Sequence, residues 1–202
     1  SEVVVVVDAT APPAYAAVDI VVQAEHGPDG LAWLVTWDEA VADAVEAEVA
    51  RIVEASPRRD DVNGTLASAG WTVLVDGPDE ALTVVDVIAP EHLQLMVDGA
   101  EALADRVRHA GAIFCGPWSP ASLGDYVAGP SHVLPTAGTA RFSGALTVAD
   151  FTKEVHVVTA DRGALERLAP HVAALADAEG LDAHAYSVRI RMADGPGGTA
   201  GG

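Results

Sequence analysis

Runs of apolar residues alternate along this chain with longer amphipathic segments. Residues 2–7 (EVVVVV) are apolar almost without interruption, which is typical of a strand buried on both faces of a sheet. Residues 39–55 carry valine and isoleucine at helical spacing, so one face of the predicted helix is apolar. The same reasoning predicts the remaining elements of this part of the chain: strands over 31–35, 71–75 and 112–115, and helices over 14–26, 79–88 and 100–109.

Strands that alternate with helices indicate an α/β domain with a mostly parallel sheet and flanking helices, which we place at residues 1–150. Beyond it the pattern predicts a small second α/β unit over residues 151–192. Its elements would be strands over 155–159 and 187–190 and a helix over 165–179. The tail, residues 193–202 (ADGPGGTAGG), is rich in glycine and proline and is predicted to be disordered.

Charge and composition exclude several classes of partner. The 202 residues include 11 Lys and Arg against 30 Asp and Glu, a formal net charge of −19, which argues against binding to nucleic acid or to anionic lipid. No apolar run approaches the roughly 18 residues that span a bilayer, so no membrane partner is expected. A single cysteine excludes an internal disulfide and fits a reducing compartment. The chain enters a buried strand directly after Ser1, which predicts that it is part of a longer protein.

Two short strings carry chemically useful side chains. In QAEHGPDG, Gln23 and His26 are three residues apart at a predicted helix end, so one metal ion could bind both, or His26 could simply be favoured by the helix dipole. In APEHL, Glu91 and His92 follow a helix break forced by proline. A carboxylate beside an imidazole suits two proton transfers, although a plain helix N-terminus would use the same residues.

The string GPWSPASLGDYVAGPSHVLPTAGTARF, residues 116–142, interleaves aromatic residues with glycine, proline and serine, as loops that line a site often do. Asp125 and His132 are its candidate ligands or bases, unless Asp125 only accepts a backbone N–H bond. Near the end of the chain, the string EGLDAHAYSVRIR holds Glu179 and His184. A lone histidine before a predicted strand is more often a surface residue than a ligand. Cys115 ends an apolar run and is expected to be a small core residue and not a nucleophile.

These strings occur in the order and at the approximate spacing found in histidinol dehydrogenases, and the chain resembles that family over nearly its whole length apart from the tail. The segment GDYVAGPSHVLPT is the most specific part of the resemblance. The resemblance implies a Rossmann-like, aldehyde-dehydrogenase-like fold. It also implies that this chain corresponds to the C-terminal half of the family's chain. The implied activity is the oxidation of L-histidinol to L-histidine through L-histidinal, with NAD+ as oxidant, in cytoplasmic histidine biosynthesis. The residues that bind NAD+ would lie upstream of residue 1.

The resemblance also implies particular roles. Glu91 and His92 would handle protons, His92 accepting the proton of the alcohol and Glu91 activating water. One zinc ion per subunit would be bound by Gln23, His26, Asp125 and His184. The protein would be a homodimer in which the second unit is swapped, so that Glu179 and His184 reach the site from the partner subunit. The implied contacts with L-histidinol come from Ser1, Gln23, His26, His92, Asp125, His132, Glu179 and His184.

Two positions depart from the family pattern, since Ala121 stands where glutamate is expected and Ser131 where asparagine is common. Both could alter contacts around the metal ligands. Two other interpretations stay open at the level of sequence. The chain could be a non-catalytic module that binds zinc or imidazole, or it could belong to another zinc-dependent alcohol or amino-alcohol dehydrogenase on the same scaffold.

Overall fold

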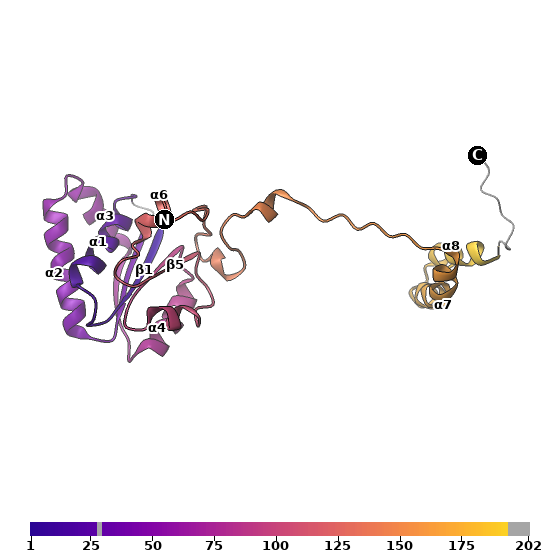
Figure 1. Ribbon diagram of the computed structural model, residues 1–202, viewed down its shortest axis with the longest axis horizontal. Coiled ribbons are helices and arrows are strands. Elements are labelled where there is room, and N and C mark those ends of the chain that lie inside the picture. Colours follow the sequence, from indigo (N-terminus) through magenta and orange to yellow (C-terminus); the bar gives the residue numbers. More distant parts are fainter. Residues whose placement is uncertain (28–29, 194–202) are drawn as a thin grey trace. The chain divides into compact units, whose positions relative to one another are not determined.

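The computed structural model describes residues 1–27 and 30–193. Its first unit, Ser1–Thr152, is built on a parallel five-stranded sheet with the order β3-β2-β1-β4-β5. This arrangement confirms the predicted α/β class with flanking helices (Figure 1). The strands are β1 (Glu2–Val7), β2 (Leu31–Thr36), β3 (Gly70–Leu74), β4 (His92–Met96) and β5 (Ala112–Cys115).

The valine run forms the central strand, β1, as its unbroken apolar pattern predicts. Val3 and Val5 face a core shared with α1 and α2, whereas Val4 and Val6 face the opposite core shared with α4 and β4. All four are at most 1% exposed, and each buried side chain contributes roughly 1.5–3 kcal/mol of transfer free energy. The two-sided burial of β1 therefore fixes where the two layers of helices must lie.

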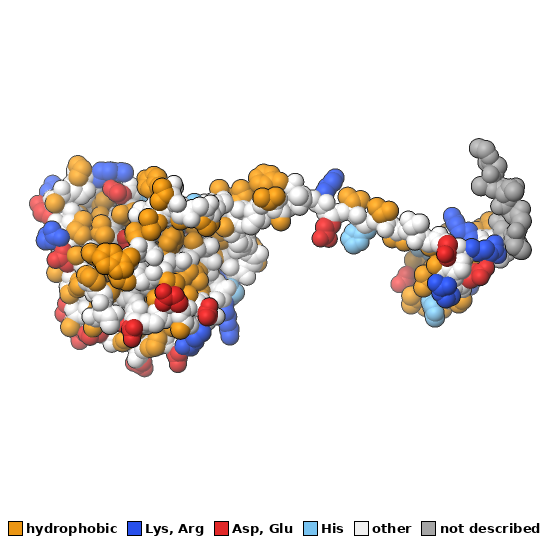
Figure 2. All heavy atoms as spheres, viewed as in Figure 1, with side chains coloured by type: hydrophobic (Ala, Val, Ile, Leu, Met, Phe, Trp, Pro, Cys, Tyr) orange, Lys and Arg blue, Asp and Glu red, His pale blue; other side chains and the backbone are white. Residues whose placement is uncertain are grey.

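Helices α1, α2 and α3 lie on one side of the sheet and α4 lies on the other (Figure 1). In this view apolar side chains also reach the surface of the first unit (Figure 2). Within the described residues, no helix combines the length and apolar character that crossing a bilayer requires. The helices of this unit are α1 (Pro13–Ala24), α2 (Glu39–Ala55), α3 (Arg59–Ala69), α4 (Pro78–Ile88), α5 (Ala100–Ala104) and α6 (Ala121–Tyr126), followed by the 3₁₀ turns η1 (Thr139–Arg141) and η2 (Val148–Phe151).

Strand β4 was not predicted, and it corrects the interpretation of APEHL as a loop or a helix start. Helix α4 ends at Ile88, and Ala89 takes a left-handed conformation with φ of 52° while its N–H still bonds the Val85 carbonyl. The chain then extends, and His92 is the first residue of the strand. The strand escaped detection because Gln94 interrupts its apolar pattern, although that side chain is fully buried.

Helices α3 and α6 were also missed, and α5 ends at Ala104, five residues earlier than expected. The signal for α3 is weak because only Val62 and Thr65 are buried in it. Helix α6 is six residues long and buries none of its residues, so its sequence lacks the periodicity that predicts a helix.

The second unit begins at Lys153, and its described part contains two helices and no strand. The predicted α/β character of this unit is therefore wrong. Residues 155–159 form no strand and have no regular secondary structure, and the segment around residues 187–190 lies inside α8 (Asp182–Ala193). Val188 alternates with polar neighbours, yet it also lies three residues after Ala185, and both are buried in the helical hairpin with α7 (Arg162–Glu179). Helical spacing thus outweighs the alternating pattern.

The predicted disordered tail needs one correction, because Ala193 is the last residue of α8. The remaining tail residues, 194–202, lie outside the described part of the chain.

Asp19, on α1, is an ionisable residue buried without a partner among the described residues. It is 7% exposed, and its Oδ2 atom has no hydrogen-bond partner. Burial disfavours the carboxylate and raises the pKa of Asp19 from 3.8 to about 6. Because the folded state holds this proton more tightly than the unfolded state does, Asp19 lowers stability as the pH rises from 3.8 to about 6, and the cost persists above that range.

Replacement of Asp19 by asparagine is therefore expected to raise the free energy of unfolding at neutral pH by about 1–3 kcal/mol. The gain over wild type should disappear near pH 4, where Asp19 is protonated in both states. Urea unfolding of both proteins across this pH range measures the difference, and a gain independent of pH would contradict the assignment.

Candidate functional site

The candidate site lies at the end of the sheet where the inner strands β1 and β4 begin. The two strands are parallel neighbours in which Val3 pairs with His92, so Ser1 and Glu91, each just before its strand, meet at this end. The Ser1 hydroxyl donates to Glu91 Oε2 at 2.8 Å, and the Glu2 N–H donates to the same oxygen at 3.0 Å. These two bonds fix the Glu91 carboxylate beside His92, whose Nδ1 is 3.8 Å from Oε2.

Gln23 joins this group from the last turn of α1. Its Oε1 lies 3.2 Å from Ser1 Oγ, while its Nε2 is buried with no hydrogen-bond partner. The single Ser1 hydroxyl proton is already engaged by Glu91 at the shorter distance. If the Gln23 amide is turned over, Nε2 donates to Ser1 and Oε1 becomes a free acceptor, which satisfies both observations. Gln23 thus offers a buried carbonyl oxygen that fits a cation.

The tautomer of His92 follows from its backbone partner. Its Nδ1 lies 2.9 Å from the Glu2 carbonyl oxygen, which can only accept, so Nδ1 carries the proton and Nε2 keeps the lone pair. The side chain is buried, and this burial lowers the pKa of His92 by disfavouring the imidazolium, against the opposing effects of the Glu2 carbonyl and of Glu91. His92 is therefore held as a neutral base with Nε2 directed into the site.

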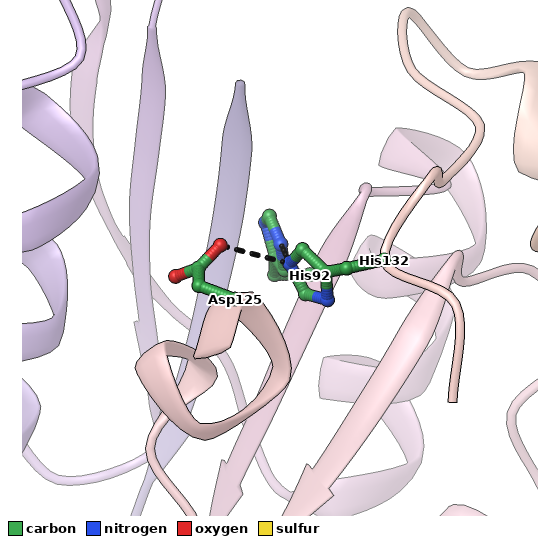
Figure 3. A group of neighbouring side chains, drawn as sticks. All are labelled: His92, Asp125 and His132. Carbon is green, nitrogen blue, oxygen red and sulfur yellow. Dashed lines mark hydrogen bonds and ion pairs between the residues drawn. The ribbon is translucent and has the colours of Figure 1, made fainter. Parts of the chain in front are cut away.

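His132 and Asp125 face this lone pair from the loop and from α6 (Figure 3). His132 Nε2 lies 2.8 Å from His92 Nε2 and 3.1 Å from Asp125 Oδ1. The two imidazole rings are stacked with their centroids 4.9 Å apart. One ligand atom from each of the three residues lies within 4.8 Å of the others, so together they form a candidate metal centre.

His92, Asp125 and His132 together leave one acceptor without a hydrogen-bond donor or a cation. His132 Nε2 can carry a single proton, yet it faces two acceptors, the lone pair of His92 Nε2 and the Asp125 carboxylate. A metal ion or a cationic N–H group of a ligand would satisfy the acceptor that this proton leaves unpaired. The chemistry of the donor set therefore fits a cation at this end of the sheet.

Glu2 secures the loop that carries His132. Its buried carboxylate accepts the Ala137 N–H at 2.6 Å, and Ala137 has a left-handed φ of 52°. The residue thus contacts the loop with its side chain and His92 with its carbonyl. Sequence reasoning missed Glu2 because it reads as the first residue of a core strand, and backbone carbonyls leave no sequence signal.

Gly124 allows the close approach of α6 to His132. A Cβ atom at this position would lie 2.5 Å from His132 Cε1 and 2.8 Å from Phe114 Cζ. Replacement of Gly124 by alanine should therefore overpack the site and lower the free energy of unfolding by about 1–3 kcal/mol.

Gly64 provides the matched control, since it lies within exposed α3 and its Cβ would meet nothing within 4 Å. Alanine there should raise the free energy of unfolding by about 0.5–1 kcal/mol through helix propensity. Urea unfolding measures both variants, and two shifts of the same sign would refute the packing argument.

Three predicted site residues are not gathered into this network. His26 is exposed in the turn that follows α1. Its backbone N–H donates to the Gln23 carbonyl, but its side chain makes no hydrogen bond among the described residues. Glu179 ends α7 and His184 lies in α8, both exposed in the second unit, and their part in the site stays a prediction. Cys115 is half-buried, and burial, followed by the charges of Glu101 and Asp105, raises its pKa and keeps the thiol protonated.

The candidate metal centre differs from the ligand set that the resemblance implies, because only Asp125 belongs to both. Of the two positions that depart from the family pattern, Ala121 begins α6 and the Ser131 hydroxyl accepts a long bond of 3.4 Å from the Val133 N–H. Neither contacts the three residues of the centre through a side-chain hydrogen bond within the described structure.

A Rossmann-like parallel sheet, with a carboxylate–imidazole pair and a candidate metal centre where β1 and β4 begin, defines an α/β protein with a candidate metal site. The sequence model of the family described as histidinol dehydrogenase matches residues 1–192. The chain belongs to the histidinol dehydrogenase family, which confirms the resemblance seen in its sequence.

Individual relatives agree with this assignment. The histidinol dehydrogenase of Thermobifida fusca is 49% identical over 193 residues, covering 95% of this chain and 44% of that protein. The histidinol dehydrogenase of Parasynechococcus marenigrum is 45% identical over 192 residues, with the same shares. The crystal structure of histidinol dehydrogenase from Elizabethkingia anophelis superposes with a TM-score of 0.88 at 32% identity, covering 95% of this chain and 44% of that one. The chain thus spans less than half of each relative, and its correspondence to the C-terminal half stays a prediction.

Proposed function

We propose that this chain forms the zinc- and histidinol-binding part of a histidinol dehydrogenase, which oxidises L-histidinol to L-histidine in cytoplasmic histidine biosynthesis. The observation that carries the proposal is the pairing of Glu91 with His92, whose Oε2 and Nδ1 atoms are 3.8 Å apart. The pair lies next to His132, whose single Nε2 proton cannot satisfy both His92 Nε2 and Asp125. Since the chain spans 44% of its relatives, the complete reaction would also need residues outside it.

His92 would act as the base. Its Nδ1–H is held by the Glu2 carbonyl. Its Nε2 lone pair lies 2.8 Å from His132 Nε2, and a substrate hydroxyl would take the place of that contact. Because burial lowers the pKa of His92, the imidazole is free to accept the alcohol proton at neutral pH. Once it has released that proton to solvent, the same nitrogen would accept another when the hydrated aldehyde is oxidised.

Glu91 would prepare the water that hydrates L-histidinal. Ser1 and the Glu2 N–H both hold Oε2, so the orientation of the carboxylate is fixed. Among the described residues Oε1 has no hydrogen-bond partner, and it is the oxygen that we assign to water. The carboxylate would remove a proton from that water as its oxygen attacks the aldehyde carbon.

Gln23, His26, Asp125 and His184 would bind the zinc ion, His184 coming from the partner subunit. Zinc in such a site would orient the imidazole and amine of L-histidinol and act as a Lewis acid. We prefer this set to His92, Asp125 and His132, because a metal bound at His92 Nε2 would occupy the lone pair that accepts protons. The buried, unpartnered Gln23 amide supports the choice. NAD+ would accept the hydride and would bind to residues outside this chain.

A homodimer would complete the site. In support, Val155, Val157 and Val158 lie in a segment without regular secondary structure and are 70%, 85% and 89% exposed. Burying such a segment against a partner strand removes apolar surface from water and pairs its backbone. We expect sedimentation velocity to give a dimer, and replacement of Val155 and Val157 by threonine to weaken it. A monomer at micromolar concentration would contradict this proposal.

Histidinol-dependent formation of NADH by the protein restored to the length of its relatives tests the proposed function. Activity with L-histidinol and none with L-leucinol, an amino alcohol without imidazole, is expected. Equal activity with L-leucinol would favour a general amino-alcohol dehydrogenase, and zinc-dependent binding of L-histidinol without any turnover would favour a non-catalytic module.

A further inference from the structure

A cavity lies between α1 and the segment that leads into α6. Its volume is about 370 Å³, and it shares no residue with the site described above. Apolar and aromatic side chains form most of its wall, and Asp19 is the single residue in it that carries a charge at neutral pH. The lining consists of Tyr15, Val18, Asp19, Met96, Pro117, Trp118, Pro120 and Leu123.

Asp19 gives this cavity an uncompensated acceptor. The residue is 93% buried, as its 7% exposure shows, and its Oδ2 has no hydrogen-bond partner. No lysine, arginine or histidine lines the cavity. A buried carboxylate without a donor is costly, so a group that brings positive charge into the cavity would be strongly favoured over a neutral one.

Two aromatic rings line the cavity. Tyr15 and Trp118 meet edge to face, with ring centroids 5.9 Å apart and an interplanar angle of 66°. Trp118 is 78% exposed, so much of its surface is free to contact a ligand. Aromatic faces attract cations and also provide apolar surface for a flat group.

We propose that this cavity binds a small organic cation, an ammonium or amidinium group carried on a flat apolar body. The charge would pair with Asp19, and the apolar body would pack against Tyr15 and Trp118. The volume lies within the range of small-molecule sites. A bare divalent cation would need several oxygen ligands, whereas the lining offers one carboxylate, and an anion would be repelled by it. The proposal uses no residue of the proposed catalytic function and stands apart from it.

Calorimetric titration of benzylamine into this chain tests the proposal, with a chelator present so that the amine cannot bind a metal. Benzyl alcohol serves as the neutral probe of the same shape. We expect benzylamine to bind at least tenfold more tightly than benzyl alcohol. Replacement of Asp19 by asparagine should abolish this preference while leaving benzyl alcohol binding unchanged, and replacement of the exposed Trp118 by alanine should weaken both probes.

Replacement of Asp43 by asparagine is the matched control, because it removes one negative charge from an exposed position on α2. It should change benzylamine affinity less than twofold. The proposal is overturned by equal affinities of the two probes for wild type, by no binding of benzylamine up to about 10 mM, or by an equal loss in the Asp43 and Asp19 variants. The Asp19 variant is expected to be more stable than wild type, so its loss of binding cannot be attributed to unfolding, and urea unfolding checks this.

Discussion

Replacing His92 by alanine is expected to lower histidinol-dependent NADH formation by about 10²–10⁴-fold in the protein restored to the length of its relatives. The reason lies in the geometry of one imidazole. The Glu2 carbonyl holds the Nδ1 proton, and burial lowers the pKa of His92, so Nε2 is an oriented and unprotonated base. Without it the alcohol proton must leave to water, which is neither oriented nor as basic.

Steady-state rates at saturating L-histidinol and NAD+ measure this loss. His109 offers a control, since it lies outside the candidate site, where its backbone N–H bonds the Asp86 carboxylate. Replacement of His109 by alanine should leave the rate within about threefold of wild type. A His92 variant that keeps wild-type activity would remove His92 from the reaction and, with it, the assignment of Glu91 and His92 as the proton-transfer pair.

Replacing Asp125 by alanine is expected to weaken zinc binding by more than the roughly 10–100-fold that the loss of an outer-shell partner costs. Asp125 belongs to both candidate ligand sets, and its Oδ1 is already 3.1 Å from the His132 imidazole. Its loss removes a charged ligand from either arrangement. Competition against a chromophoric zinc chelator measures the affinity, with replacement of exposed Asp43 by asparagine as the control.

The same assay separates the two ligand sets. If Gln23 and His26 bind zinc, replacement of His26 by alanine should weaken binding to a similar extent, whereas replacement of His132 should change it by less than tenfold. The reverse outcome would assign the metal to His92, Asp125 and His132. It would also contradict the role of His92 as a free base.

The fold of the first unit was predictable where one principle governs a segment. The valine run of β1 is buried on both faces, and nothing else competes with that pattern. Prediction failed where a polar residue is buried for a local reason, as Gln94 is in β4, and where two periodicities coincide, as at Ala185 and Val188. The prediction of a strand over 155–159 failed for a further reason, because a strand requires a neighbouring strand that the sequence does not specify.

The members of the candidate site were predictable in part, and its contacts were not. Glu91 and His92 stand out because they follow a proline that ends a helix, and Asp125 and His132 because they lie in a segment rich in glycine, proline and serine. The contacts that define their chemistry come from Glu2, whose carbonyl fixes the His92 tautomer and whose carboxylate holds the Ala137 N–H. Backbone groups and the register of β1 against β4 set these contacts, and neither is visible in the pattern of side chains.

The central claim is that residues of this chain, Gln23, His26 and Asp125 with Glu91 and His92, assemble one site for metal and substrate. Calorimetric titration of L-histidinol into this chain, once with zinc and once after chelation, tests it most directly. The account predicts binding that requires zinc and that is lost when His26 is replaced by alanine. Binding of equal strength with and without zinc, or none in a sample shown to be folded by circular dichroism, would contradict it.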